Sequence, residues 1–136
     1  MTAPTAFRWL LLAIATAVLT GCFSGSAAAP PLDAASFQEA YDRLGTMIEQ
    51  AQAGDADAAE EEYLQAQQIT QRVSEALEEL PVTVIIRSEM LDVALLIRQE
   101  LAEWRRADFL AAHAERLRGI LRDAAVALGI DPPQRD

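Results

Sequence analysis

Apolar side chains recur at intervals of three and four residues over positions 37–128, and this spacing constrains the fold more than any other feature. Residues three and four apart share one face of an α-helix, so each stripe predicts a helix with one buried side. The first two stripes are Phe37, Tyr41, Leu44, Ile48 and Ala51, then Ala59, Tyr63, Ala66, Ile69 or Thr70, Val73, Leu77 and Leu80. The last two are Val82, Ile86, Met90, Ala94, Ile97, Leu101 and Trp104, then Leu110, His113, Leu117, Ile120 or Leu121, Ala124 and Leu128.

Breaks between the stripes predict four separate helices. Gly54-Asp55 interrupts the first pair, and Pro81 lies between the second and third stripes. No Gly or Pro separates the last two stripes, but a continuous helix would rotate its apolar face by roughly 140–160° across residues 105–108. One straight helix cannot keep both stripes in one core, so we expect a turn there, with Asp108 as N-cap.

These helices predict an all-α fold, an antiparallel up-down-up-down four-helix bundle, because short connections force neighbouring helices to run antiparallel. With 136 residues the chain has room for one domain, which we expect over residues 33–130. Residues 131–136 follow Gly129 and are expected to form a frayed C-terminal tail. The expected capping boxes are Ser36 with Glu39 and Asp57 with Glu60.

The charge balance narrows the set of partners. The chain has 11 basic and 21 acidic residues, a formal net charge of −10. An excess of this sign argues against nucleic acid as a partner. It also argues against electrostatic binding to anionic lipids, because no cluster of basic residues is present.

The N-terminus has the pattern of an export signal. Residues 1–8 contain one positive charge, at Arg8, and residues 9–18 are apolar except for Thr16. This run is too short for a transmembrane helix, which needs about 20 apolar residues. It suits the apolar region of a signal peptide.

The residues that follow, Leu19-Thr20-Gly21-Cys22, resemble the lipobox of bacterial lipoproteins, the motif cut by signal peptidase II. The resemblance covers residues 1–22, while the family of the domain itself is not recognised. It implies that residues 1–21 are removed and that Cys22 carries diacylglycerol and fatty acid such as palmitate. Two or more acyl chains anchor a protein stably. The alternative is an ordinary secretory signal with an incidental cysteine.

The lipobox also implies a location outside the cytoplasm, on the surface of a membrane. Phe23, rather than Asp, follows Cys22. In a Gram-negative cell the lipoprotein sorting rule then implies the outer membrane, facing the periplasm, and in a Gram-positive cell the outside of its single membrane. Residues 22–32 have no periodic apolar pattern and are expected to form a flexible tether.

The third predicted helix carries a second apolar stripe besides the one that faces the core. A bundle helix needs only one apolar face. Two interpretations are open. In one, both stripes pack internally against flanking helices. In the other, the second stripe forms a surface that receives an amphipathic helix from a partner or a second copy of the chain. The candidate partner-binding residues are Val84, Leu91, Leu95 and Ala102.

One histidine raises the alternative of a haem or ligand carrier. His113 in the last helix and Met47 in the first are expected to approach each other across an antiparallel bundle. Their combination resembles four-helix cytochromes that bind haem b through one Met and one His. A packed or hydrogen-bonded histidine is the simpler interpretation, and no cofactor is expected.

Catalysis and metal binding lack a sequence basis. No nucleophile elbow, phosphate-binding loop or zinc-type His-Glu spacing is present, so no enzyme is predicted. The carboxylate pairs Glu75/Glu78 and Glu100/Glu103 have the spacing of a solvated helix face, so no metal site is predicted.

The sequence therefore favours a membrane-anchored protein-binding or assembly module. Its size, anchor and helix count are similar to those of type II secretion pilotins and of lumenal photosystem II assembly lipoproteins. A diagnostic motif of either is missing, and a single cysteine cannot form the disulfide of typical type II pilotins. A structural envelope or stress lipoprotein is the further alternative.

Overall fold

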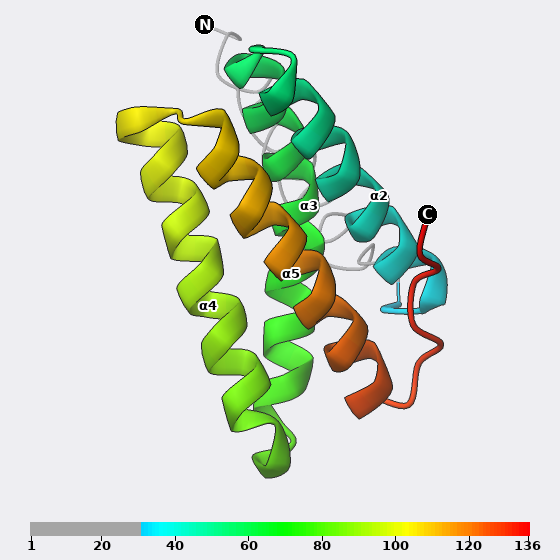
Figure 1. Cartoon of the computed structure of the whole chain (residues 1–136). Helices are drawn as coiled ribbons and strands as arrows, with labels where there is room; N and C mark the ends of the chain where they lie inside the picture. Colours follow the sequence, from blue (N-terminus) through cyan, green and yellow to red (C-terminus); the bar gives the residue numbers. More distant parts are fainter. Residues whose placement is uncertain (1–30) are drawn as a thin grey trace, which may run out of the picture. The chain divides into compact units, whose positions relative to one another are not determined.

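The computed structural model describes residues 31–136 and places four α-helices between Leu32 and Asp136 (Figure 1). No β-strand occurs in this stretch, so the prediction of an all-α fold with four separate helices is confirmed. The helices are α2 (Ala34–Gln52), α3 (Ala56–Glu78), α4 (Val84–Gln99) and α5 (Ala107–Ala127). A 3₁₀ turn, η1 (Pro81–Thr83), precedes α4, and a π-helical turn, η2 (Glu100–Trp104), follows it.

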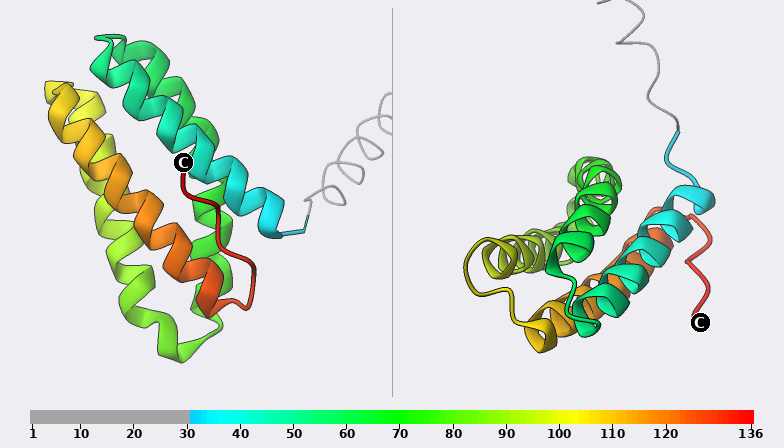
Figure 2. Two further views of the ribbon diagram at one scale, coloured as in Figure 1. Left: turned by 45° about the vertical axis from the view of Figure 1, so that its right-hand side comes forward. Right: turned by 90° about the horizontal axis from the view of Figure 1, so that it is seen from above.

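The four helices pack in a ring in which each has two neighbours. Helix α2 lies against α3 and α5, and α4 lies against α5 and, less extensively, α3. Figure 2 shows the same arrangement from two further directions. Arg105, between η2 and α5, donates to Asp57 and Glu60 near the start of α3, at 2.8 and 3.0 Å. This side chain therefore links the α4–α5 connection to the start of α3.

The core lies inside this ring. The predicted stripes of the first two helices supply much of it, with Met47 buried in place of the half-buried Ile48. Buried apolar residues of α4, η2 and α5 complete it. The core cluster is Phe37, Ala40, Leu44, Met47, Ala51, Ala59, Tyr63, Ala66, Ile69, Val73, Leu77, Met90, Val93, Ile97, Leu101, Leu110, Ala114, Leu117, Ile120, Leu121, Ala124 and Ala125.

The predicted stripe of the third helix is wrong at both ends. Val82 is 91% exposed and Trp104 is 53% exposed. They lie in η1 and η2, whose helical pitch differs from that of α4, so the spacing no longer keeps them on the buried face. Within α4, Val93 takes the core position predicted for Ala94, which is only half-buried.

The start of each of the first two helices differs from the expected cap. Asp33, rather than Ser36, is the N-cap of α2: its carboxylate accepts the Ser36 N–H at 2.9 Å, and Ser36 completes the capping box. Asp55, rather than Asp57, caps α3 by accepting the Ala58 N–H at 3.0 Å. In both cases an acidic residue two or three positions earlier in the chain takes the role.

The expected turn between the last two helices is present, but Asp108 is not its N-cap. The chain reverses at Arg105, whose φ of 52° is left-handed, and the Arg105 N–H donates to the Glu100 carbonyl at 2.6 Å. Arg106 is the N-cap residue of α5, and its N–H donates to the Glu100 carboxylate at 3.3 Å. This bond satisfies the N–H of the N-cap residue itself, and no side chain among the described residues caps the first turn of α5.

The C-terminal residues 131–136 do not fray as expected. Gly129 adopts a left-handed φ of 71° at the end of α5 and turns the chain back. Pro133 is buried, and the Gln134 N–H donates to the Gln38 side chain of α2 at 2.8 Å. The tail therefore bridges α5 and α2. Residues 131–136 have no periodic pattern that would have indicated this contact.

Candidate functional site

A groove of about 470 Å³ lies between α3 and α4. One wall is apolar, with Leu91 and Leu95 of α4, and the opposite wall is polar, with Gln67, Gln71 and Glu75 of α3. The remaining lining residues are Thr70, Ser74, Arg87, Met90, Ala94 and Arg98. Thr70, Ser74 and Ala94 have small side chains, which leave space between the two helices. Helices α3 and α4 accordingly meet less extensively than the other neighbouring helices of the ring.

Two further hollows extend the groove in opposite directions along the same two helices. A hollow of about 680 Å³ shares Gln67, Leu95 and Arg98 with it. Another of about 210 Å³ shares Arg87 and Leu91. The groove therefore follows α3 and α4 over much of their length.

The four candidate partner-binding residues all line this set of hollows. Leu91 and Leu95 line the central one, Val84 lines the smallest and Ala102 lines the largest. Val84, Leu91 and Leu95 are 66%, 47% and 64% exposed, and Ala102 is exposed as well. The second stripe therefore does not pack inside the helical unit.

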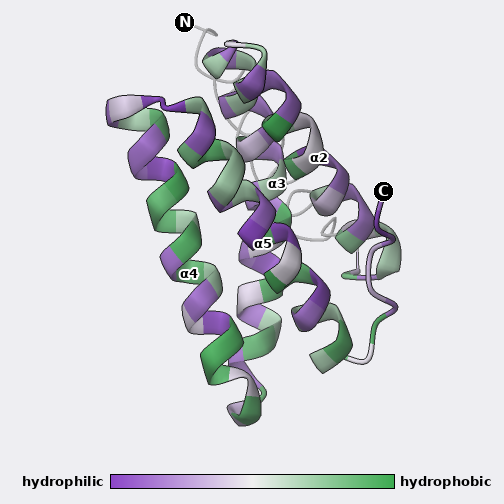
Figure 3. Cartoon of the chain, in the orientation of Figure 1, coloured by the Kyte–Doolittle hydropathy of each residue, from purple (hydrophilic) through white to green (hydrophobic). Residues whose placement is uncertain are grey.

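Helix α4 carries apolar residues on several faces. Its core residues and its groove residues occupy different faces of the helix. Met90, Val93 and Ile97 face the core. Ile85 and Leu96 add further exposed apolar surface that the predicted stripes left out. Figure 3 shows hydrophobic residues over much of α4. Adjacent apolar pairs in the sequence, such as Leu95-Leu96, are the signal that identifies them.

The apolar pattern of the sequence did not identify the α3 wall of the groove. Its contribution consists of Gln67, Gln71 and Glu75, together with the small buried residues Thr70 and Ser74. These residue types resemble an ordinary solvated helix face. Only the distance between α3 and α4 turns them into one side of a groove.

Charged side chains line the groove on both helices. Arg87 of α4 donates to Glu78 of α3 at 3.3 Å, which bridges the groove near one end. The Arg87 Nε is buried and has no hydrogen-bond partner among the described residues. Glu75 is exposed one turn before Glu78, so carboxylates line the α3 side of this end.

Tyr63 connects the two helices below the surface of the groove. Its hydroxyl donates to the Ala94 carbonyl of α4 at 3.1 Å, and its side chain is 1% exposed. Burial raises the pKa of Tyr63 to about 12, although the nearby Arg98 acts in the opposite direction. The neutral phenol is therefore the form that the folded protein favours.

This pKa predicts an alkaline loss of stability. The contribution of Tyr63 is fully present below pH 10 and is lost as the pH rises towards 12, because the unfolded chain releases the phenol proton first. A shift of this size corresponds to about 2–3 kcal/mol. Because the chain contains no lysine, few other groups titrate in this window.

Urea unfolding of wild type and Tyr63→Phe at several pH values between 8 and 12 measures the effect. The free energy of unfolding of wild type is expected to fall more steeply with pH than that of the variant. Parallel pH profiles for the two proteins would contradict the assignment.

The two residues considered for haem binding lie in different environments. Met47 is fully buried in the core. His113 is half-buried on the flank of α5, with its ring centroid 6.4 Å from that of Phe109. The core position that the spacing assigned to His113 is taken by the neighbouring Ala114. The haem-carrier alternative stays a prediction.

Of the two carboxylate pairs considered for a metal, Glu75 and Glu78 are both exposed on α3, whereas the fold places Glu100 and Glu103 in different environments. Glu100 is buried and binds the guanidinium of Arg106, whereas Glu103 is exposed. This hydrogen bond, despite burial, lowers the pKa of Glu100 below its usual value. Among residues 31–136 no three His, Cys, Asp or Glu side chains gather in a way that suits a metal ion.

The predicted export signal, lipobox and most of the tether, including Cys22, lie outside the described residues. Within residues 31–136, none of the helices combines the length and apolar character needed to cross a membrane. Comparison of the chain with protein-family models, curated proteins and solved structures finds no match.

Proposed function

We propose that this protein is a membrane-anchored docking module that binds one amphipathic helix of a partner protein in the groove between α3 and α4. The observation that carries the proposal is the exposed apolar row Val84, Leu91, Leu95 and Ala102 along that groove. Exposed apolar surface beside a hollow is typical of a binding site for another protein. The proposed activity is binding, without catalysis.

The spacing of the row favours a helix as the occupant. With Ser88 and Arg98 included, the positions are 84, 88, 91, 95, 98 and 102, at intervals of four and three. This is the spacing of the seam between two packed helices. A helix laid along α4 would meet an apolar side chain at four of these six positions.

The charges around the groove define the other side of that helix. The α3 wall presents Glu75 and Glu78, of which Glu78 pairs with Arg87 of α4, and the chain has a net charge of −10. We expect the partner helix to place its apolar stripe against Leu91 and Leu95 and basic residues towards α3. Such complementarity raises the association rate and selects the orientation of the helix.

The proposal includes the anchor and the order of the helices. The lipobox Leu19-Thr20-Gly21-Cys22 supports lipid attachment at Cys22 and an extracytoplasmic location, with residues 22–32 as a tether. The short connections and the link from Arg105 to Asp57 support an antiparallel up-down-up-down bundle.

Photo-crosslinking in membranes of the producing bacterium tests the docking groove. A photoreactive amino acid replaces Leu95 in one variant and Val126 in another. Val126 is a matched control, because it is 66% exposed but lies on α5 and lines none of the three hollows. We expect a discrete adduct from position 95 only.

The crosslinked peptide then decides the nature of the occupant. An amphipathic segment with basic residues beside its apolar stripe supports the proposal. Identical adducts from both positions, no adduct from position 95, or an adduct only with a second copy of the chain would overturn it.

A further inference from the structure

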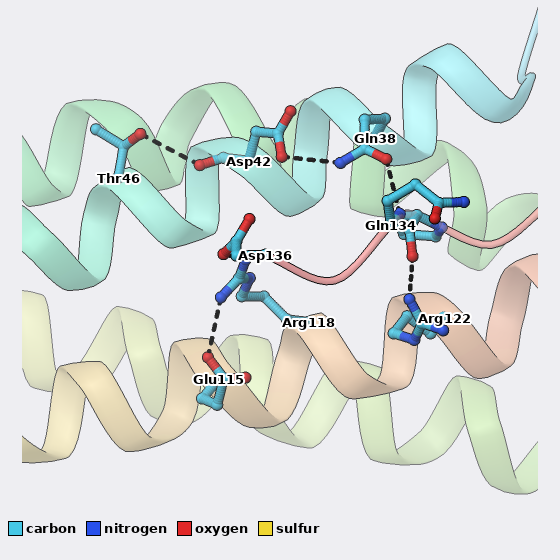
Figure 4. A network of polar contacts seen from close by, with 9 residues as sticks. Gln38, Asp42, Thr46, Glu115, Arg118, Arg122, Gln134 and Asp136 are labelled. Atoms are coloured by element: carbon cyan, nitrogen blue, oxygen red, sulfur yellow. Dashed lines mark hydrogen bonds and ion pairs between the residues drawn. The ribbon is translucent and has the colours of Figure 1, made fainter.

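A second site lies on the opposite side of the helical ring, where the tail of residues 131–136 crosses from α5 to α2. Figure 4 shows that groups of this tail meet side chains of both helices. The Gln134 N–H donates to the Gln38 side chain, and Arg122 of α5 donates to the Pro133 carbonyl. Arg118, one turn before Arg122, donates to the Asp136 carboxylate at 2.6 Å.

Arg118 is the centre of this site, and it is held firmly. The residue is 7% exposed, and its guanidinium carbon lies 3.8 Å from the centroid of the Tyr41 ring. The guanidinium also lies against Gly45 of α2, where an added Cβ would come within 3.3 Å of Nη2. Glycine at this position therefore leaves the space that the arginine occupies.

The hydrogen bonds of Arg118 are incomplete. Nη1 donates to Glu115 at 3.2 Å and Nη2 to Asp136, while the buried Nε has no partner among the described residues. Burial acts to lower the pKa of Arg118, but its carboxylate partners raise it above the usual value. A buried cation requires a counter-charge, because desolvation penalises an unpaired one.

The two members of the ion pair differ in how firmly the fold holds them. The Arg118 side chain is 9% exposed, whereas the Asp136 side chain is 76% exposed. The adjoining cavity has a volume of about 510 Å³ and is lined by Arg122 and Arg135 as well as Arg118. The cation is therefore a fixed part of the core boundary, and its carboxylate partner can be exchanged.

We propose that the cavity around Arg118 is a binding site for a carboxylate ligand, which the Asp136 carboxylate occupies in the absence of that ligand. Arg118 and Arg122 lie four residues apart on α5, so their guanidinium groups project from the same face. Their present partners are a carboxylate and a carbonyl of the tail. An external carboxylate with a second oxygen acceptor satisfies the same donors.

In this arrangement the tail is a tethered competitor. A group held by a short chain has an effective concentration in the millimolar range, so it weakens the apparent affinity for a free ligand. Removing the Asp136 charge is expected to strengthen ligand binding, whereas removing Arg118 is expected to abolish it. If the ion pair between Arg118 and Asp136 were purely structural, removing the Asp136 charge would not increase the affinity for a ligand.

Titration of the full chain in neutral detergent with succinate tests this site. The Nε–H signals of isotopically labelled arginine report binding, and all eleven of the chain's Lys and Arg positions are arginine. Asp136→Asn is expected to increase the affinity for succinate about tenfold, from the loss of a competitor with millimolar effective concentration. Asp131→Asn, an exposed carboxylate on the same tail, is the matched control and is expected to behave as wild type.

Variants of Arg118 and a second anion complete the test. Arg118→Gln and Arg118→Lys are expected to lose succinate binding, and inorganic phosphate is expected to bind more weakly than succinate. Equal affinity in wild type and Asp136→Asn, an equal gain in Asp131→Asn, or stronger binding of phosphate would overturn the proposal. Asp136→Asn removes one counter-charge of Arg118 but leaves Glu115 in place, and circular dichroism of the variant without succinate checks that its fold is intact.

Discussion

The double substitution Leu91→Asp/Leu95→Asp is expected to weaken partner binding about 100-fold or more. Both side chains lie on the apolar wall of the α3–α4 groove, where an apolar anchor contributes about 2 kcal/mol or more to binding. The substitutions also place two carboxylates opposite Glu75, in a groove that we expect to receive an apolar stripe. Titration with a synthetic peptide of the crosslinked partner segment measures the affinity.

The same substitutions separate binding from folding. Leu91 and Leu95 are 47% and 64% exposed, so the free energy of unfolding is expected to change by less than about 1 kcal/mol. Val126→Asp is the matched control, with the same type of change on α5, and is expected to retain full affinity. Unchanged binding by the double variant, with its fold intact, would refute the docking role of the groove.

Phe37→Ala is expected to lower the free energy of unfolding by about 3–5 kcal/mol. Phe37 is fully buried in the first turn of α2, where it joins the core cluster. Removing the ring takes away its apolar contacts and leaves a cavity that the helices fill only in part. A domain of this size has a stability of about 5–15 kcal/mol, so the loss is a large fraction of the whole.

Phe109→Ala is the matched control for this prediction. Phe109 is 47% exposed at the start of α5, and its replacement is expected to cost less than about 1 kcal/mol. Urea unfolding of the full chain in neutral detergent, followed by circular dichroism, compares the two variants. A loss in Phe37→Ala no larger than that in Phe109→Ala would contradict the prediction.

The helices were predictable because their spacing depends on local geometry. Phe37, Tyr41 and Leu44 on α2 and Ala59, Tyr63 on α3 are buried as the spacing indicates. Pro81 and the change of phase after Trp104 correctly separated the later helices. These features require only that one face of each helix meets a common core.

The caps and turns were less predictable because several residues compete for each role. Asp33 and Asp55 took the caps assigned to Ser36 and Asp57, and α5 has no side-chain cap where Asp108 was expected to give one. A polar residue near a helix start can serve as a cap from several positions. Local sequence does not decide which one the tertiary contacts select.

The two candidate sites differ in how much the sequence disclosed. The second stripe of α4 named Val84, Leu91, Leu95 and Ala102, because its residues exceed what one buried face requires. The Arg118 site gave no such signal, since its parts are Tyr41, Gly45 and a tail without periodicity. Contacts between residues far apart in sequence create that site, and a pattern within one helix cannot show them.

The ring order of the helices places the two proposed sites on opposite sides of the bundle. The α3–α4 groove and the α2–α5 seam with Arg118 use different helices and share no lining residue. With each helix about 10–12 Å across, one ligand on each side would be held apart by the thickness of the core. A helix in the proposed groove leaves the proposed carboxylate site open, so we expect the two ligands to bind at the same time.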